Sequence, residues 1–331
     1  MSSRTRLALA LAVATWLAAP GAASADLIIT FDVPPGLGNP PNSTFGLGIN
    51  NGGVVVGYYV NAAGTVTQGF QRNADGTLVT GIVAPGDNTN TTQLFGLNNS
   101  GAAVGTFLTL SGNTNTFHGF TKVGNTFTQY DVGGPVSTST SGINDLGHTA
   151  GTFGSTVQPN QGFLLIGNVM TTISVAGASA LFGTGLNNLD QVVGNFTDSG
   201  GVTHGYFRSA GGVISPIDVP GATSTQARGI NDSGEIVGTY TVGAVSHGFL
   251  DVGGVFTTFD VPGAASTRIN GVNNLGFITG RYTDTLGVVH GFLTAPVPEP
   301  SSLLLAGLGL AVAAAVRGAP ALRRVFTQRA S

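Results

Sequence analysis

The chain has 331 residues, of which 53 are glycine, none is cysteine and only 8% are charged. This composition excludes disulfide bonds and thiolate metal sites, and two glutamates and one lysine are too few for a typical helical protein. Between Asp26 and Val297, six basic residues stand against fourteen acidic ones, a net charge of about −8. That balance argues against a nucleic-acid partner, because phosphate binding needs a basic surface.

Residues 1–25 have the three-part pattern of a secretory signal peptide. Arg4 and Arg6 precede an apolar run from Leu7 to Ala18, and small residues follow up to Ala23-Ser24-Ala25. Ala23 and Ala25 predict cleavage by signal peptidase after Ala25. An uncleaved membrane anchor is the alternative, although the run is short for a membrane span.

Residues 26–296 contain six copies of one unit. Each copy has a phrase of Gly, an aliphatic residue and Asn, a second phrase of Gln or His, Gly and an aromatic residue, and a third phrase such as FDVPG (259–263). The asparagines of the first phrase recur every 42 to 48 residues, at Asn50, Asn98, Asn144, Asn187, Asn231 and Asn273. Periods in the forties that contain several short strands are typical of β-propeller blades or β-solenoid coils.

The phasing of the repeats favours a propeller. The fifth unit contains four strand-like pieces (224–231, 235–240, 247–252 and 255–261), and its Asn-Asp-Ser-Gly sequence suits a hairpin turn. The body begins with LIITFDVP, a fourth strand without its first three, and ends with HGFLTAP, a third strand without its fourth. The sequence therefore predicts an all-β, six-bladed propeller of four-stranded repeats that the N-terminal strand closes.

Glycine and aromatic residues alternate within the repeats in a way that suggests packing. Six glycines each stand two residues before an aromatic residue, at Gly57, Gly105, Gly151, Gly194, Gly238 and Gly280. Residues two apart share one face of a strand, so we expect each glycine to leave space for that aromatic ring. These phrases also resemble the HAF-type repeats of exported bacterial proteins, a resemblance that implies no defined activity.

Residues that recur in every unit are expected to serve folding, so catalysis would depend on residues that break the repeat. His118, His204, His247 and His290 are predicted to be structural, because equivalent residues of different blades lie too far apart to share a metal ion. The recurrent aspartates (Asp32, Asp131, Asp218 and Asp260) are predicted to cap turns. His148 breaks the repeat but has no obvious partner.

The common catalytic motifs are absent from the sequence. It contains no Gly-x-Ser-x-Gly, His-Glu-x-x-His or P-loop signature, and Glu235 is the one glutamate of the body. We therefore predict no catalytic residue, no cofactor and no metal ligand, with a calcium site at Asp198 or Asp284 left open. The candidate binding residues lie in variable loops (85–93, 109–117, 153–161 and 283–289) or their neighbours on one rim, and they are Asn88, Asn113, Asp198 and Asp284.

Residues 297–331 form a sorting signal in three parts. Pro298-Glu299-Pro300 is followed by an apolar run, predicted to be a helix over 303–316, and by Arg323-Arg324. The run is shorter than the ~20 residues of a spanning helix. The three parts together resemble the PEP-CTERM sorting signal. That resemblance implies a precursor held transiently in the inner membrane of a Gram-negative bacterium until an exosortase processes it.

These features predict an exported structural or binding protein of the cell surface, the extracellular medium or a biofilm matrix. Its variable loops would contact a partner, with exopolysaccharide as the candidate. An enzyme acting on polysaccharide, either a hydrolase or a lyase, is the alternative.

Overall fold

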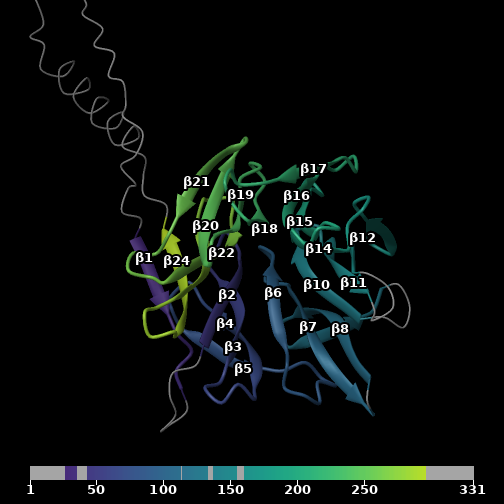
Figure 1. Ribbon diagram of the computed structural model, residues 1–331. Coiled ribbons are helices and arrows are strands. Elements are labelled where there is room, and N and C mark those ends of the chain that lie inside the picture. Colours follow the sequence, from purple (N-terminus) through teal and green to yellow (C-terminus); the bar gives the residue numbers. More distant parts are fainter. Residues whose placement is uncertain (1–26, 36–42, 113, 133–136, 155–159, 296–331) are drawn as a thin grey trace, which may run out of the picture. The chain divides into compact units, whose positions relative to one another are not determined.

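The computed structural model describes residues 27–35, 43–112, 114–132, 137–154 and 160–295. Within these ranges the chain forms six antiparallel sheets of four strands each and no helix (Figure 1). We number these sheets blades 1 to 6, starting with the sheet that contains β2. The predicted all-β, six-bladed propeller is confirmed.

The first three blades each consist of four consecutive strands, in spatial order along the chain. Their strands are β2 (Ser43–Ile49), β3 (Val55–Val60), β4 (Thr67–Arg72) and β5 (Leu78–Ile82) in blade 1; β6 (Gln93–Leu97), β7 (Ala103–Ser111), β8 (Thr114–Val123) and β9 (Thr126–Tyr130) in blade 2; and β10 (Ser137–Ile143), β11 (Thr149–Gly154), β12 (Gln161–Ile166) and β13 (Val169–Ile173) in blade 3.

Blades 4 and 5 repeat this order, whereas blade 6 combines the two ends of the body. Their strands are β14 (Ala180–Leu186), β15 (Val192–Thr197), β16 (Thr203–Arg208) and β17 (Ile214–Ile217) in blade 4; β18 (Ser224–Ile230), β19 (Ile236–Val242), β20 (Val245–Val252) and β21 (Val255–Phe259) in blade 5; and β22 (Ser266–Val272), β23 (Ile278–Thr283), β24 (Val289–Ala295) and β1 (Leu27–Phe31) in blade 6.

Blade 6 closes the ring as the sequence predicts. Strand β1 pairs antiparallel with β24 from Leu27↔Ala295 to Phe31↔Gly291, and Figure 1 shows the two strands side by side. Phe31 is buried, and its ring contacts the ring of Phe70 in blade 1 at 5.9 Å. The N-terminal strand thus both completes its sheet and packs against the next blade.

The first strand of each blade lies innermost and contacts the first strands of the blades on either side, with β22 meeting β2. All six inner strands carry a register shift at the same place, immediately before the Gly-aliphatic-Asn phrase. A Cβ atom on Gly48 would lie 2.8 Å from the carbonyl oxygen of Phe95 on the next inner strand. Glycine at this position allows neighbouring strands to approach closely around the axis.

In each repeat, the glycine that stands two residues before an aromatic residue also lies under an aromatic ring. That ring is not the predicted one. Gly238 is the cross-strand partner of Phe249, and a Cβ atom there would lie 2.7 Å from the Phe249 ring. The expectation that the ring comes from Tyr240, two residues further along the same strand, is wrong. The equivalent pairs in the other blades are Gly57–Phe70, Gly105–Phe120, Gly151–Phe163, Gly194–Tyr206 and Gly280–Phe292.

The hydrophobic core lies between blades. One cluster joins Val237 of blade 5 to Ile269, Ile278 and Phe292 of blade 6, and comparable clusters join other neighbouring blades. Fully burying such side chains contributes about 1.5–3 kcal/mol each, which compensates for the absence of disulfide bonds.

The two ends of the chain lie outside the described residues. These ends include the predicted signal peptide (1–25), with Ala23 and Ala25, and the predicted sorting signal (297–331), with its helix at 303–316. Within the ranges that the structure describes, no helix is long and apolar enough to cross a bilayer.

Candidate functional site

Strand order gives the propeller two different faces. The turns between first and second strands, and between third and fourth strands, lie on one face, which we call the closed face. The loops between second and third strands, and from each fourth strand to the next blade, lie on the other, which we call the open face. The inner strands surround the axis of the ring, and they line separate cavities between the two faces; we call this axial space the channel.

A ring of asparagine side chains surrounds the channel at the closed face. Each recurrent asparagine has two roles, as Asn98 illustrates: its Oδ1 accepts the N–H of Ala102 (2.9 Å), and its Nδ2 donates to the Asn144 carbonyl in the next blade (3.0 Å). The inter-blade bond is repeated six times around the ring, at 2.9–3.2 Å, from Asn50, Asn98, Asn144, Asn187, Asn231 and Asn273. The sequence indicated the turn, but the bond between blades was missed.

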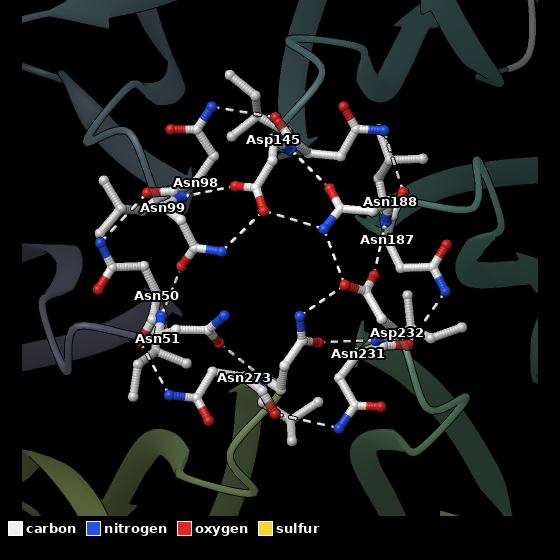
Figure 2. A pocket seen from close by; sticks show the side chains of 18 residues that line it. Asn50, Asn51, Asn98, Asn99, Asp145, Asn187, Asn188, Asn231, Asp232 and Asn273 are labelled. Carbon is white, nitrogen blue, oxygen red and sulfur yellow. Dashed lines mark hydrogen bonds between the residues drawn. The ribbon is translucent and has the colours of Figure 1, made fainter.

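The residue after each recurrent asparagine forms a second ring (Figure 2). Each backbone N–H of this second ring donates to a side-chain oxygen of the equivalent residue in the next blade, at Asn51, Asn99, Asp145, Asn188, Asp232 and Asn274. Asp145 accepts the side-chain amides of Asn99 (2.8 Å) and Asn188 (3.0 Å) as well. Burial opposes the charge of Asp145, but these hydrogen bonds outweigh it and lower the pKa of the carboxyl group.

The closed-face rings form a seam rather than a binding site. The depression that they line has a volume of about 60 Å³, and most of its polar groups bond to one another. A cavity of this size has room for only a few water molecules. The rings therefore join the six blades at the axis.

The histidines on the open face pair with the recurrent aspartates. The Nδ1 atoms of four histidines lie 2.8–3.0 Å from a carboxylate oxygen, in His118–Asp131, His204–Asp218, His247–Asp260 and His290–Asp32. The prediction that these aspartates cap turns is therefore corrected. The register brings Gly205 opposite Ile217, so His204 and Asp218 become neighbours across two strands.

Each of these histidine rings also lies against an aromatic ring of the second strand, as His290 does against Tyr282 at 4.9 Å. In blade 1, where Gln68 replaces histidine, the Tyr59 hydroxyl donates to Gln68 Oε1 (2.6 Å). Among the described residues, no three histidine, aspartate or glutamate side chains gather as a metal site. The pairs hold the third and fourth strands together within single blades.

His148 has a partner that the sequence did not reveal. Its Nδ1 lies 2.7 Å from Oδ1 of Asp190, and Asn144 also donates to that oxygen (3.0 Å). Asp190 belongs to the closed-face turn of blade 4 and adopts a positive φ of 57°. This pair therefore reinforces the seam between blades 3 and 4.

The candidate rim residues that are described hold their loops in shape. Asn88 exchanges two hydrogen bonds with the backbone of Leu110, each 3.0 Å long. Asp198 accepts the N–H groups of Gly200 and Val202, and the latter bond is the largest cause of the lowered pKa of its carboxyl group. Asp284 has the same role in its own turn, whereas Asn113 lies outside the described residues.

The open face carries a cavity of about 570 Å³ at the mouth of the channel, over blades 2 to 5. Its aromatic side chains are Phe95, Phe117, Phe153 and Phe182, and Phe117 is 42% exposed. Its polar side chains are the amides of Gln93, Asn160, Asn195 and Gln226, the hydroxyl groups of several serines and threonines, and Arg228. No carboxylate or imidazole is present among the described residues that line it.

Three arginines gather beside this cavity. Arg228 of β18 lies on the channel wall, and Arg268 of β22 is the cross-strand partner of Arg281 of β23. Arg268 and Arg281 line a second open-face cavity of about 180 Å³ together with Phe45. In the sequence these arginines contribute only to the charge balance, because no motif connects them.

Comparison with protein families finds the PEP-CTERM protein-sorting motif at residues 296–318. The match includes the predicted Pro298, Glu299 and Pro300, whereas Arg323 and Arg324 lie beyond it. The motif indicates an exported protein whose precursor passes through a membrane-held stage. No curated protein matches the chain.

Solved structures with a similar fold include a fungal lectin, the protein AofleA and a sialidase. A lectin of Aleuria aurantia, described as a six-bladed β-propeller, has 10% identity and a TM-score of 0.49, over 77% of this chain and 96% of the lectin. A mutant of AofleA from Arthrobotrys oligospora has 14% identity and a TM-score of 0.48, over 82% and 91%. The Trypanosoma rangeli sialidase has 11% identity and a TM-score of 0.46, over 87% and 60%.

Proposed function

We propose that the protein is an exported, non-catalytic carbohydrate-binding propeller whose ligand occupies the open-face cavity. Signal peptidase would remove residues 1–25, and an exosortase would process the precursor near Pro298-Glu299-Pro300. The body would then act at the cell surface or in an extracellular polysaccharide matrix. Its resemblance to the HAF-type repeats of exported bacterial proteins is consistent with such a location.

The observation that carries this proposal is the lining of the 570 Å³ cavity. Partly exposed phenylalanine rings offer flat apolar surfaces, and the amides of Gln93, Asn160 and Gln226 offer both donors and acceptors. Sugar rings have apolar faces and hydroxyl edges, so they match such a lining. Cavities of 300–1,000 Å³ are typical of small-ligand sites.

The lining argues against the alternative of a polysaccharide hydrolase. Glycoside hydrolysis by the common route requires two carboxyl groups about 5–10 Å apart on either side of the scissile bond. The described carboxylates instead bond to histidines, asparagines or turn N–H groups. Substrate in this cavity would therefore meet no acid–base pair.

Binding to a glycan array tests the proposal, with the full chain purified in detergent. We expect retention on a subset of saccharides and no cleavage of them. Phe182→Ala should weaken binding about tenfold, because losing the stacking contact with one aromatic ring costs about 1.4 kcal/mol. Phe256→Ala, a partly buried phenylalanine on the outer strand β21, is the matched control. Equal loss in both variants, or release of cleaved sugar, would overturn the proposal.

A further inference from the structure

Three arginines at the channel (Arg228, Arg268 and Arg281) lie so close together that their positive charges destabilise the folded protein. Arg268 and Arg281 are directly opposite each other on adjacent antiparallel strands, where like charges destabilise a sheet. Arg228 projects from the neighbouring inner strand, and the positive charges of Arg281 and Arg268 act on it. Half of the six basic residues of the body therefore lie in one cluster.

No negative charge in the described part of the chain compensates the cluster. Thirteen of the fifteen acidic side chains belong to the described residues, and none lies within 4.0 Å of these three guanidinium groups. The other two, Asp26 and Glu299, belong to the ends of the chain outside those residues. The remaining basic side chains behave differently, because Arg72, Arg208 and Lys122 each donate to a backbone carbonyl nearby.

The cluster also retains hydrogen-bonding capacity. Nε of Arg228 is buried and has no hydrogen-bond partner, while its terminal nitrogen donates to Oε1 of Gln226. Burial, together with Arg281 and Arg268, lowers the pKa of Arg228 to about 10, so the side chain remains charged at neutral pH. A buried N–H of a charged group without an acceptor is costly, and a bound anion would supply the acceptor.

The surroundings hold the arginines in place. The guanidinium carbon of Arg281 lies 4.6 Å from the centre of the Phe45 ring, and Phe45 stacks on Tyr58 at 4.5 Å. Burial is the main cause of the lowered pKa of Arg281, and the electrostatic interaction with the nearby Tyr58 side chain partly offsets it. Arginine stacked on an aromatic ring is already ordered, so it loses less entropy when it binds an anion.

We propose that Arg228, Arg268 and Arg281 bind an anionic oxygen group, a carboxylate or a sulfate, of an acidic saccharide. That the ligand is a saccharide rests on the proposed function. That the ligand carries an anionic group rests on the arginine cluster. Both cavities open on the same face, and Arg228 belongs to the larger one while Arg268 and Arg281 line the smaller one. A sugar ring against Phe95 or Phe182 could therefore present its charged group to the guanidinium groups.

The test compares three ligand types on the full chain in detergent: a tetragalacturonate, a sulfated disaccharide and a neutral maltotetraose, with sodium acetate and sulfate as small anions. We expect an acidic saccharide to bind at least about tenfold more tightly than maltotetraose, with an affinity that falls as salt rises. Arg228→Gln and Arg268→Gln should each abolish that preference. Arg208→Gln removes one positive charge outside the channel and should leave the preference for acidic saccharides unchanged.

The outcomes separate this inference from the proposed function. Equal binding of neutral and acidic saccharides, unchanged in Arg228→Gln, would overturn the inference and leave the carbohydrate proposal standing. Binding of acetate or sulfate that depends on Arg228, with no saccharide bound, would support the anion site and overturn the carbohydrate proposal. An equal loss in Arg208→Gln would overturn the anion site, because the effect would then come from net charge.

Discussion

The Nδ2 amide of Asn273 donates to the carbonyl of Asn50 at 2.9 Å, across 223 residues of sequence. This bond joins blade 6 to blade 1 and completes a ring of six equivalent bonds around the channel. The pairing of β1 with β24 closes the same ring at its edge. The propeller is therefore closed both by side-chain amides at the axis and by backbone pairing at the periphery.

Two substitutions of Asn98 should separate the roles of the recurrent asparagine. Asn98→Ala removes the turn bond to Ala102 and the bond to blade 3, and we expect it to destabilise the fold by about 2–3 kcal/mol. Asn98→Asp keeps the acceptor for the turn and replaces the inter-blade donor by a carboxylate oxygen, so we expect an intermediate loss. Urea unfolding measures both. An Asn98→Asp variant as stable as wild type would show that the inter-blade bond contributes nothing.

Removing the N-terminal strand should destabilise the whole body. A chain that begins after Val33 loses the ladder to β24 and the buried side chains of Phe31 and Val33. Loss of one buried aromatic side chain alone costs about 3–5 kcal/mol, so we expect the melting temperature to fall by about 10 °C or more. A chain that begins at Asp26 is the control. A truncated chain with an unchanged melting temperature would contradict closure by β1.

Gly238→Ala should be among the most damaging small substitutions. A Cβ atom at this position would lie 2.1 Å from the Gln226 carbonyl oxygen and 2.7 Å from the Phe249 ring. Because both contacts are too short, the inner strand or the ring must move, and we expect a loss of about 3 kcal/mol. Gly211→Ala is the control, since its nearest neighbour would lie at 3.9 Å. Calorimetry that gives equal melting temperatures for the two variants would refute this packing role.

The histidine–aspartate pairs should make stability depend on pH. Burial opposes the charge of His204, but Asp218 and Asp198 outweigh it and raise the pKa of His204, as Asp32 and Asp284 do for His290. A raised folded-state pKa stabilises the protein below the ordinary value of about 6.5, and this contribution is lost as the pH rises through the folded-state value.

Replacing both histidines by glutamine, the residue that blades 1 and 3 carry at this position, should flatten that dependence. Urea midpoints of wild type and the His204→Gln/His290→Gln double variant, measured from about pH 5 to pH 9, provide the comparison. We expect the stability of wild type to decline above about pH 6.5 relative to the variant. Parallel curves for the two proteins would contradict the role of these pairs.

The repeats made most of the fold predictable. Six Gly-aliphatic-Asn phrases gave the number of blades, and the displaced strand at residues 27–33 gave the closure of the ring, because both depend on local pattern. Contacts between side chains of different strands were harder to predict from the sequence. The ring above Gly238 comes from Phe249, and the partner of Asp218 is His204, because cross-strand register brings together residues that lie eleven and fourteen positions apart.

The arginine cluster could not be derived from spacing, since Arg228 and Arg281 occupy different positions in different repeats. The sequence did contain a signal for Arg228. Its equivalents in the other units are Leu47, Phe95, Ser141, Thr184 and Asn270, so it breaks the repeat, as a functional residue would. Only the arrangement of blades 5 and 6 around the channel brings it near Arg268 and Arg281.

A crystal structure of the protein with a bound acidic oligosaccharide, such as tetragalacturonate, would decide whether the open-face cavity and the channel arginines form the saccharide site. We expect a sugar ring in the open-face cavity and an anionic oxygen within hydrogen-bonding distance of the guanidinium of Arg228. A saccharide bound on the outer edge of a blade, with the channel arginines uncontacted, would contradict this expectation.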